Sequence, residues 1–344
     1  MNAYHTIETP RSVMGAIAMI RVVHPDPSAI GLIDPAMRSV RLGEVFGIDQ
    51  AVIVRWDADS IMLMPHGGVA IVRAISDALA QCGVPIREVL DPVGAYPEAE
   101  NEIEAWMLAV LSRAMSPLAI DVLIDQPRRW KALGVDRLSD AARVGEVADG
   151  QVLDRLIVPP IVAAVGRANV GKSTLINALA GESVALVADV AGTTRDHVGV
   201  LVDLGGLVVR WIDTPGIDER VGDGDDGEAI EIALRVVGQA DVIVHCIDAG
   251  DDCGQLDDRL ESVIGAKAQR VAAGMRADRG ATKCAVDVTV GFGPDGRLAG
   301  VESLVEQIRE ALVPRKILAD ERPWRFWAGV EDGVADGIGD GASR

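Results

Sequence analysis

The stretch 161–180, IVAAVGRANVGKSTLINALA, decides the fold of this chain. Its first five residues are apolar and predict a buried strand, and residues 166–173 then fit the pattern G-x-x-x-x-G-K-[S/T] without a gap. A helix is expected to follow at 172–180. In such a strand–loop–helix unit, glycines let backbone N–H groups surround phosphates, and the helix N-terminus adds partial positive charge. The stretch therefore predicts a phosphate-binding loop at the start of an α/β domain.

Strands and helices alternate from this loop onward, which predicts a P-loop domain with a doubly wound, mostly parallel sheet. The expected strands are 161–165, 198–204, 207–213, 241–247, 269–274 and 284–290. The expected helices are 172–180, 228–239, 256–264 and 301–312. We assign residues 156–318 to this domain and residues 319–344 to a C-terminal tail.

Residues 1–97, upstream of the loop, are expected to form a small α+β domain. Apolar runs predict strands at 15–23, 51–56 and 61–64, and helical spacing predicts a helix from residue 69 that Gly83 ends. Residues 98–155 are expected to be a helical bridge, with helices over 100–115 and 130–148.

The motifs around the loop predict a site for a nucleoside triphosphate and Mg²⁺. Lys172 reaches the outer phosphates and the Ser173 hydroxyl ligates Mg²⁺. Thr194 is the candidate that closes over Mg²⁺ and the γ-phosphate, Asp213 holds Mg²⁺ through water, and the Gly216 amide senses the γ-phosphate. The predicted catalytic residues are Lys172, Thr194 and Gly216. The predicted nucleotide-binding residues are Asn169, Val170, Gly171, Lys172, Ser173, Thr174, Asp213, Thr214, Pro215, Gly216 and Asp278.

The base-recognition motif departs from its usual form, Asn-Lys-x-Asp, because residues 275–278 are Met-Arg-Ala-Asp. Asp278 keeps the carboxylate that accepts hydrogen bonds from guanine N1–H and the 2-amino group, and Arg276 supplies a stem to pack on the base. Met275 does not replace Asn, because a thioether is a poor acceptor and no donor. The loop that usually contributes Ser-Ala is expected at 284–286. Guanine selectivity is therefore expected but weakened, and the alternative is that Asp278 is a solvated loop acid.

Three runs carry a family resemblance: GRANVGKSTLINALAG at 166–181, VADVAGTTRD at 187–196 and DTPGID at 213–218. They resemble the TrmE-type tRNA modification GTPases. More faintly, GAIAMIRV at 15–22 and HGGVAIV at 66–72 resemble the folate-binding domain of that family. The resemblance implies hydrolysis of GTP to GDP and phosphate, in connection with tRNA modification.

The resemblance also implies a potassium ion held by Asn169. That ion, with the ordered loop 185–195, takes the part of an arginine finger when two GTPase domains form a homodimer. The alternative for Asn169 is a turn residue that satisfies its own backbone. Ile217 follows Gly216, so no glutamine stands there to position water. The alternatives for that task are Asp225, Asp226 and Glu228.

The chain departs from the family pattern in three places. No cysteine follows Cys284, the helical domain is reduced to 98–150 and a short tail, and residues 59–65 replace the usual acidic and aromatic residues before His-Gly-Gly. Folate binding and wobble-uridine chemistry are therefore left open. Two alternatives also stay open: a regulatory or ribosome-assembly GTPase without modification chemistry, and a nucleotide-binding module with negligible hydrolysis.

The composition limits the partners. With 52 acidic and 33 basic residues the net charge is −19, which disfavours bulk electrostatic binding to nucleic acid. The four cysteines lack zinc-site spacing and are interpreted as reduced thiols. Neither an apolar signal core at the N-terminus nor a run of 18 apolar residues is found, so we expect a cytoplasmic protein with no membrane partner.

Overall fold

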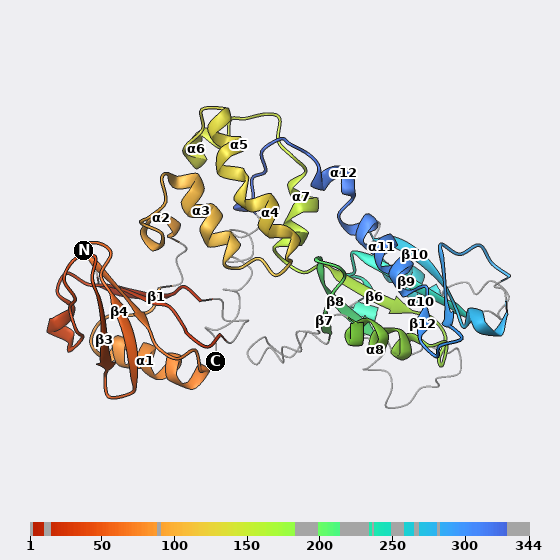
Figure 1. Cartoon of the computed structure of the whole chain (residues 1–344), viewed down its shortest axis with the longest axis horizontal. Helices are drawn as coiled ribbons and strands as arrows, with labels where there is room; N and C mark the ends of the chain where they lie inside the picture. Colours follow the sequence, from red (N-terminus) through yellow and green to blue (C-terminus); the bar gives the residue numbers. More distant parts are fainter. Residues whose placement is uncertain are drawn as a thin grey trace. The chain divides into compact units, whose positions relative to one another are not determined.

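The structure is a computed structural model whose chain divides into two compact units (Figure 1). The first is built mainly from Met1–Arg113 and Gln126–Val144, and the second mainly from Ala114–Asp125 and the chain after Gly145. The residues that the structure describes are 3–9, 15–87, 91–182, 199–213, 234–235, 237–248, 258–264, 268–280 and 283–328.

An antiparallel sheet of five strands, in the order β1-β2-β5-β4-β3, forms the body of the first unit. The helix α1, Val69–Gln81, places Ile75 and Leu79 in the same apolar core as the strands. It ends where the sequence predicts, because Gly83 adopts a φ of 81° that favours glycine. The predicted small α+β domain is therefore confirmed. Its strands are β1 Tyr4–Ile7, β2 Ile20–Val23, β3 Val40–Val45, β4 Asp49–Val54 and β5 Ser60–Met64.

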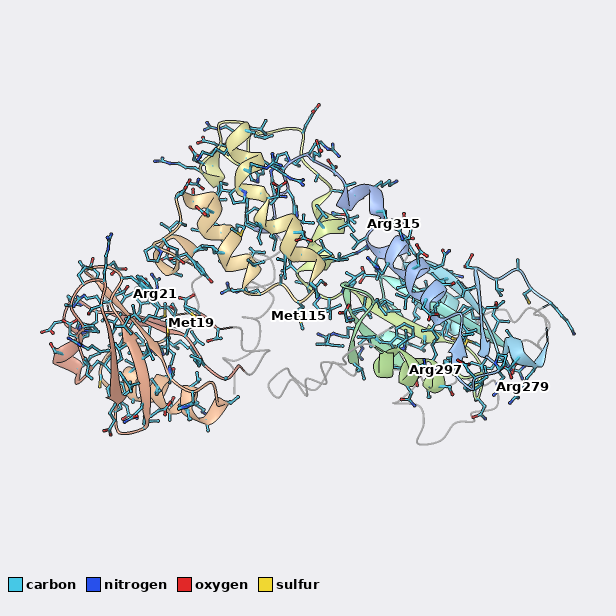
Figure 2. The ribbon with its side chains drawn as sticks, in the orientation of Figure 1. Met19, Arg21, Met115, Arg279, Arg297 and Arg315 are labelled. Atoms are coloured by element: carbon cyan, nitrogen blue, oxygen red, sulfur yellow. The ribbon has the colours of Figure 1, made fainter. Side chains whose placement is uncertain are left out.

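Two buried polar side chains tie the sheet of the first unit to segments that follow it. His5 of β1 is fully buried, and its ring nitrogens lie 2.8 Å from the Val84 carbonyl oxygen and 2.7 Å from the Ser76 hydroxyl. Arg21 of β2, labelled in Figure 2, donates to the Asp91 carboxylate at 2.8 Å. The His5 ring and Arg21 Nη2 keep hydrogen-bond partners after leaving water, which offsets the cost of burial, whereas Arg21 Nε has no hydrogen-bond partner among the described residues.

The helices of the first unit are short. Asn101 caps α3 by accepting a hydrogen bond from the Glu104 N–H at 3.0 Å. The predicted helix over 130–148 is wrong: α5 ends at Ala132, and Gly134 turns the chain with a φ of 70°. The helices are α2 Pro92–Ala95, α3 Glu102–Leu111, α5 Gln126–Ala132 and α6 Leu138–Ala141, and η1 Pro27–Ile30 is a 3-10 turn.

The second unit is a doubly wound sheet of seven strands in the order β12-β11-β10-β9-β6-β8-β7. Five strands, β11-β10-β9-β6-β8, run parallel, and β7 and β12 pair antiparallel at the two edges. The predicted α/β fold with a mostly parallel sheet is therefore confirmed. The strands are β6 Ile161–Val165, β7 Val200–Asp203, β8 Val208–Asp213, β9 Val242–Asp248, β10 Gln269–Met275, β11 Val288–Phe292 and β12 Leu298–Ala299.

The helices α8, α10 and α11 of the second unit pack on this sheet, and α11 covers it with four buried residues, among them Leu304 and Ile308. The buried residues Trp324, Phe326 and Trp327 return the chain to this unit, and Trp324 Nε1 donates to Asp154 at 3.2 Å. The helices are α4 Leu118–Ile124, α7 Gly150–Leu153, α8 Lys172–Glu182, α10 Asp258–Val263, α11 Val301–Leu312 and α12 Arg315–Leu318. The 3-10 turns are η2 Asp154–Leu156 and η3 Ala277–Arg279.

Two further predictions can be compared with the structure. Cys284 is disulfide-bonded, so the prediction of four reduced thiols is wrong there, whereas Cys82 and Cys246 are free thiols. In the part of the chain that the structure describes, no helix is both long and apolar enough to span a bilayer.

Candidate functional site

The phosphate loop leaves the buried strand β6 and turns beneath the end of β9. Gly166 has a φ of 149°, and a Cβ at this position would lie 2.4 Å from the Cys246 carbonyl oxygen. Gly171 has a φ of 110°. Since no real Cβ tolerates such an approach, the backbone can pass here only as glycine. Burial raises the pKa of the Cys246 thiol beneath the loop to about 12.

Lys172 begins α8 and folds over the loop that precedes it. Its side chain is 6% exposed, and Nζ donates to the carbonyl oxygens of Gly166 at 2.9 Å and Arg167 at 3.0 Å. Burial lowers the pKa of Lys172, while Asp213 acts in the opposite direction. Both hydrogen-bond acceptors are neutral carbonyl oxygens, so neither of them offsets the positive charge that this side chain can offer to an anion held by the loop.

Ser173 and Asp213 meet at the other side of the loop. The Ser173 hydroxyl donates to Asp213 Oδ2 at 2.8 Å, which joins the first turn of α8 to the last residue of β8. Asp213 Oδ1 is buried and has no hydrogen-bond partner among the described residues. A hydroxyl beside a carboxylate with a spare oxygen is a donor set that suits Mg²⁺, which prefers oxygen ligands. The residues therefore fit the predicted Mg²⁺, with Ser173 and Asp213 as the groups that would hold it.

Arg276 connects the base-recognition segment with the phosphate loop. Its Nη1 donates to Asp248 Oδ2 at 2.7 Å, and its Nη2 donates to the carbonyl oxygen of Asn169. Both Asn169 and Arg276 have positive φ angles, 61° and 58°. The planar guanidinium thus joins the ends of β9 and β10 to the loop, and Asp248 is a site residue that the sequence analysis missed. The sequence feature that could have identified Asp248 is an acidic residue at the carboxyl end of a parallel strand.

Asp278 lies in η3, directly after β10. Its Oδ1 accepts a hydrogen bond from the Phe292 backbone N–H at 3.1 Å. Gly291 permits this approach, because a Cβ there would lie 2.7 Å from the Asp278 nitrogen. A cavity of about 360 Å³ opens between this segment and the loop. Its lining includes Asn169, Val170, Gly171, Lys172, Ser173 and Thr174 from the loop and α8, with Met275, Arg276, Asp278, Arg279, Gly291, Phe292 and Leu298 opposite.

The loop that completes the base side of the site is not the predicted one. β11 runs from Val288 to Phe292, parallel to β10, so residues 284–286 precede it at the opposite end of the sheet from Asp278. Gly291 and Phe292, at the carboxyl end of β11, line the cavity instead. The predicted loop at 284–286 is therefore wrong, and the strand predicted at 284–290 lies at 288–292.

Part of the predicted site lies outside the described residues. Asn169, Val170, Gly171, Lys172, Ser173, Thr174 and Asp278 line one cavity, and Asp213 is bonded to Ser173. The predicted residues outside the described ranges are Thr194, Thr214, Pro215, Gly216, Asp225, Asp226 and Glu228.

Comparison with known proteins places these motifs among GTPases. The family described as 50S ribosome-binding GTPase matches residues 161–274. The tRNA modification GTPase MnmE of Roseobacter denitrificans is 30% identical over 305 residues, which cover 72% of this chain and 70% of that protein. The MnmE of Acidiphilium cryptum is 31% identical over 54% of this chain and 52% of its own length. GTPase Der of Symbiobacterium thermophilum is 35% identical over 60% of this chain and 50% of its own length.

Two solved structures show a low overall similarity to this chain. The G domain of the T. maritima FeoB iron transporter has a TM-score of 0.30 and 23% identity, over 44% of this chain and 98% of that chain. A GTP-binding protein of Sulfolobus solfataricus in complex with GDP has a TM-score of 0.34 and 15% identity, over 69% of this chain and 84% of that chain.

Proposed function

Because this chain belongs to the family of MnmE-type tRNA modification GTPases, we propose that it binds GTP with Mg²⁺, hydrolyses it to GDP and phosphate, and serves tRNA modification. The chain spans 52% of the length of the Acidiphilium relative and 70% of that of the Roseobacter relative. The activity of the whole protein and its part in tRNA modification therefore belong to the proposal. We further propose the domain division given by the sequence, with the GTPase domain at 156–318.

One observation carries the proposal, namely the arrangement of three side chains at the phosphate loop. Lys172 Nζ donates to two loop carbonyl oxygens at 2.9 and 3.0 Å. The neighbouring Ser173 hydroxyl donates to the Asp213 carboxylate at 2.8 Å. Backbone N–H groups of the loop and Lys172 would hold the phosphates in place. Mg²⁺, when bound at Ser173 and Asp213, neutralises negative charge on the phosphates. Catalysis then rests on positioning and on charge stabilisation rather than on covalent chemistry by the protein.

We propose that Asn169 holds a potassium ion and that two GTPase domains pair during hydrolysis. Asn169 lines the same cavity as Lys172 and Ser173, and the hydrogen bond from Arg276 to its carbonyl oxygen holds its backbone there. Thr194 and Gly216 complete the proposed catalytic set. Under this proposal hydrolysis is faster in potassium than in sodium buffer and rises with protein concentration.

Multiple-turnover hydrolysis tests the enzymatic part. We expect GTP to be hydrolysed, ATP to be spared, and Lys172→Ala to abolish turnover, while Lys316→Ala, an exposed lysine of α12, serves as the matched control. Turnover of GTP by Lys172→Ala at the wild-type rate would contradict the assignment of the loop. Equal rates in potassium and sodium would contradict the role of Asn169, and a turnover rate per protein that does not change with protein concentration would contradict pairing.

A ribosome-associated role is the second candidate, because the family that matches residues 161–274 is described as ribosome-binding. In that case nucleotide controls partner binding, and no base is modified. Mass spectrometry of tRNA nucleosides from a strain lacking this protein separates the two. Loss of a wobble modification supports the tRNA role, whereas unchanged tRNA with co-purified ribosomal particles supports the alternative.

A further inference from the structure

Phe292 is an exposed aromatic residue in a chain with few aromatics. The chain has 3 phenylalanines, and Phe292 is 53% exposed, while Phe326 is fully buried. It stands at the end of β11 and lines the cavity that also contains Asp278 and the phosphate loop. A large apolar side chain left in water at the wall of a ligand cavity is a candidate for ligand contact.

The backbone fixes Phe292 relative to the carboxylate that faces the base. The Phe292 N–H donates to Asp278 Oδ1 at 3.1 Å. Gly291 allows the two segments to touch, since a Cβ there would lie 2.9 Å from Asp278 Oδ1. Asp278 and Phe292 are thus held as one unit, with Leu298 beside them in the cavity wall.

Residue 275, where the usual motif has asparagine, offers the base no side-chain amide. Met275 is 2% exposed, and its Cε lies 3.4 Å from the place that a Cβ on Gly171 would take. Its side chain therefore packs against the phosphate loop as an apolar group. Arg276 is engaged by Asp248 and Asn169. Among the described residues that line this cavity, Asp278 is the acidic one, and its carboxylate can accept hydrogen bonds from the edge of a base.

We propose that Phe292 is a nucleotide-binding residue that stacks on the purine ring of the bound nucleotide. Stacking holds any purine, and Asp278 alone selects guanine through N1–H and the 2-amino group. The site therefore accepts purines that differ from guanine at N7, and it discriminates less sharply against hypoxanthine, which retains N1–H. This inference rests on the proposed binding of GTP by the same site.

Calorimetric titration of the full chain with GDP, IDP, ADP and 7-deaza-GDP tests the proposal. Wild type is expected to bind 7-deaza-GDP as tightly as GDP. Because stacking on an aromatic ring contributes to binding of every base, Phe292→Ala is expected to weaken GDP and IDP by the same factor, roughly 5- to 150-fold. Phe292→Tyr keeps the ring face and should retain affinity, whereas Phe292→Leu should lose it.

The controls separate the two proposals. Trp56→Ala removes an aromatic that is 47% exposed in the first unit and should leave all affinities unchanged. Absence of GDP binding by a folded wild-type chain overturns the proposed function. Tight GDP binding by wild type, with equal binding by Phe292→Ala or Phe292→Leu, overturns stacking and leaves the proposed function intact. Weak binding of 7-deaza-GDP shows that N7 is recognised by another group and also overturns the inference.

Discussion

At the scale of single residues, Arg276 shows that the geometry of a cationic side chain can matter more for the structure than its charge. Its φ of 58° is uncommon for a residue with a Cβ, and its guanidinium donates to two acceptors on two segments. A planar fork with several donors can serve Asp248 and the Asn169 carbonyl at once, which a lysine ammonium does with poorer geometry. Arg276 therefore connects the base-recognition segment, residues 275–278, to the phosphate loop.

We expect Arg276→Lys to weaken GDP binding by about 2- to 10-fold, because one of the two hydrogen bonds is lost at a partly exposed site. Titration with GDP measures this change. Arg297→Lys, an exposed arginine labelled in Figure 2, is the control and should bind as wild type does. Wild-type affinity of Arg276→Lys would show that the bridge does not support the nucleotide site.

Asp278→Asn is expected to change the preferred base. The amide oxygen can still accept from the Phe292 N–H, so the segment keeps its position. Its NH₂ group, however, now faces the 2-amino group of guanine as donor to donor, whereas the 2-oxo group of xanthine becomes an acceptable partner. Competition between GTP and XTP should shift toward XTP by at least tenfold. An unchanged preference would mean that Asp278 is a solvated loop acid.

At the scale of elements, helices were predicted better than edge strands. The helix predicted at 301–312 is observed with these bounds, because its apolar residues recur at helical spacing and are buried. β3 was missed because it is an edge strand whose Val40 and Leu42 are 60% and 69% exposed, so it shows no alternation of buried and exposed residues. The phosphate loop was predicted because its motif is local in sequence. Phe292 was missed because its place depends on the register of β11 against β10, which no local pattern encodes.

His5 makes the stability of its strand sensitive to pH. Burial lowers the pKa of His5 below its ordinary value of 6.5, so below that pH the unfolded chain binds more protons than the folded chain. Stability contributed by His5 is therefore present above pH 6.5 and is lost as the pH falls through that value. Urea unfolding at pH 7.5 and 5.5 should show a smaller pH difference for His5→Asn than for wild type. His24→Asn, which lies nearer the solvent, should resemble wild type.

At the scale of the whole chain, the family predicted from the motifs is confirmed by its relatives. The C-terminal aromatic residues pack back onto the second unit, where Trp324 bonds to Asp154, far upstream in the sequence. The sequence pattern predicted two domains but not this packing of the C-terminal residues, because three aromatic residues alone do not specify the surface on which they pack.

Trp324→Ala is expected to destabilise the second unit by about 3–5 kcal/mol, since it leaves a large cavity and removes one hydrogen bond to Asp154. Chemical denaturation followed by circular dichroism measures this loss. Trp56→Ala, at an exposed site, should cost less than about 0.5 kcal/mol. A similar small cost for Trp324→Ala would mean that the aromatic residues are dispensable for the fold.

The buried thiol beneath the phosphate loop gives the site a built-in chemical reporter. Cys246 is 2% exposed and its pKa is about 12, so an alkylating reagent can modify it only after the end of β9 has opened. Exposed Cys82 in the first unit reacts without any opening. The rate of labelling at Cys246, followed by mass spectrometry with Cys82 as internal standard, therefore measures how often the nucleotide site comes apart. A bound nucleotide should slow that rate in proportion to the affinity with which it is held.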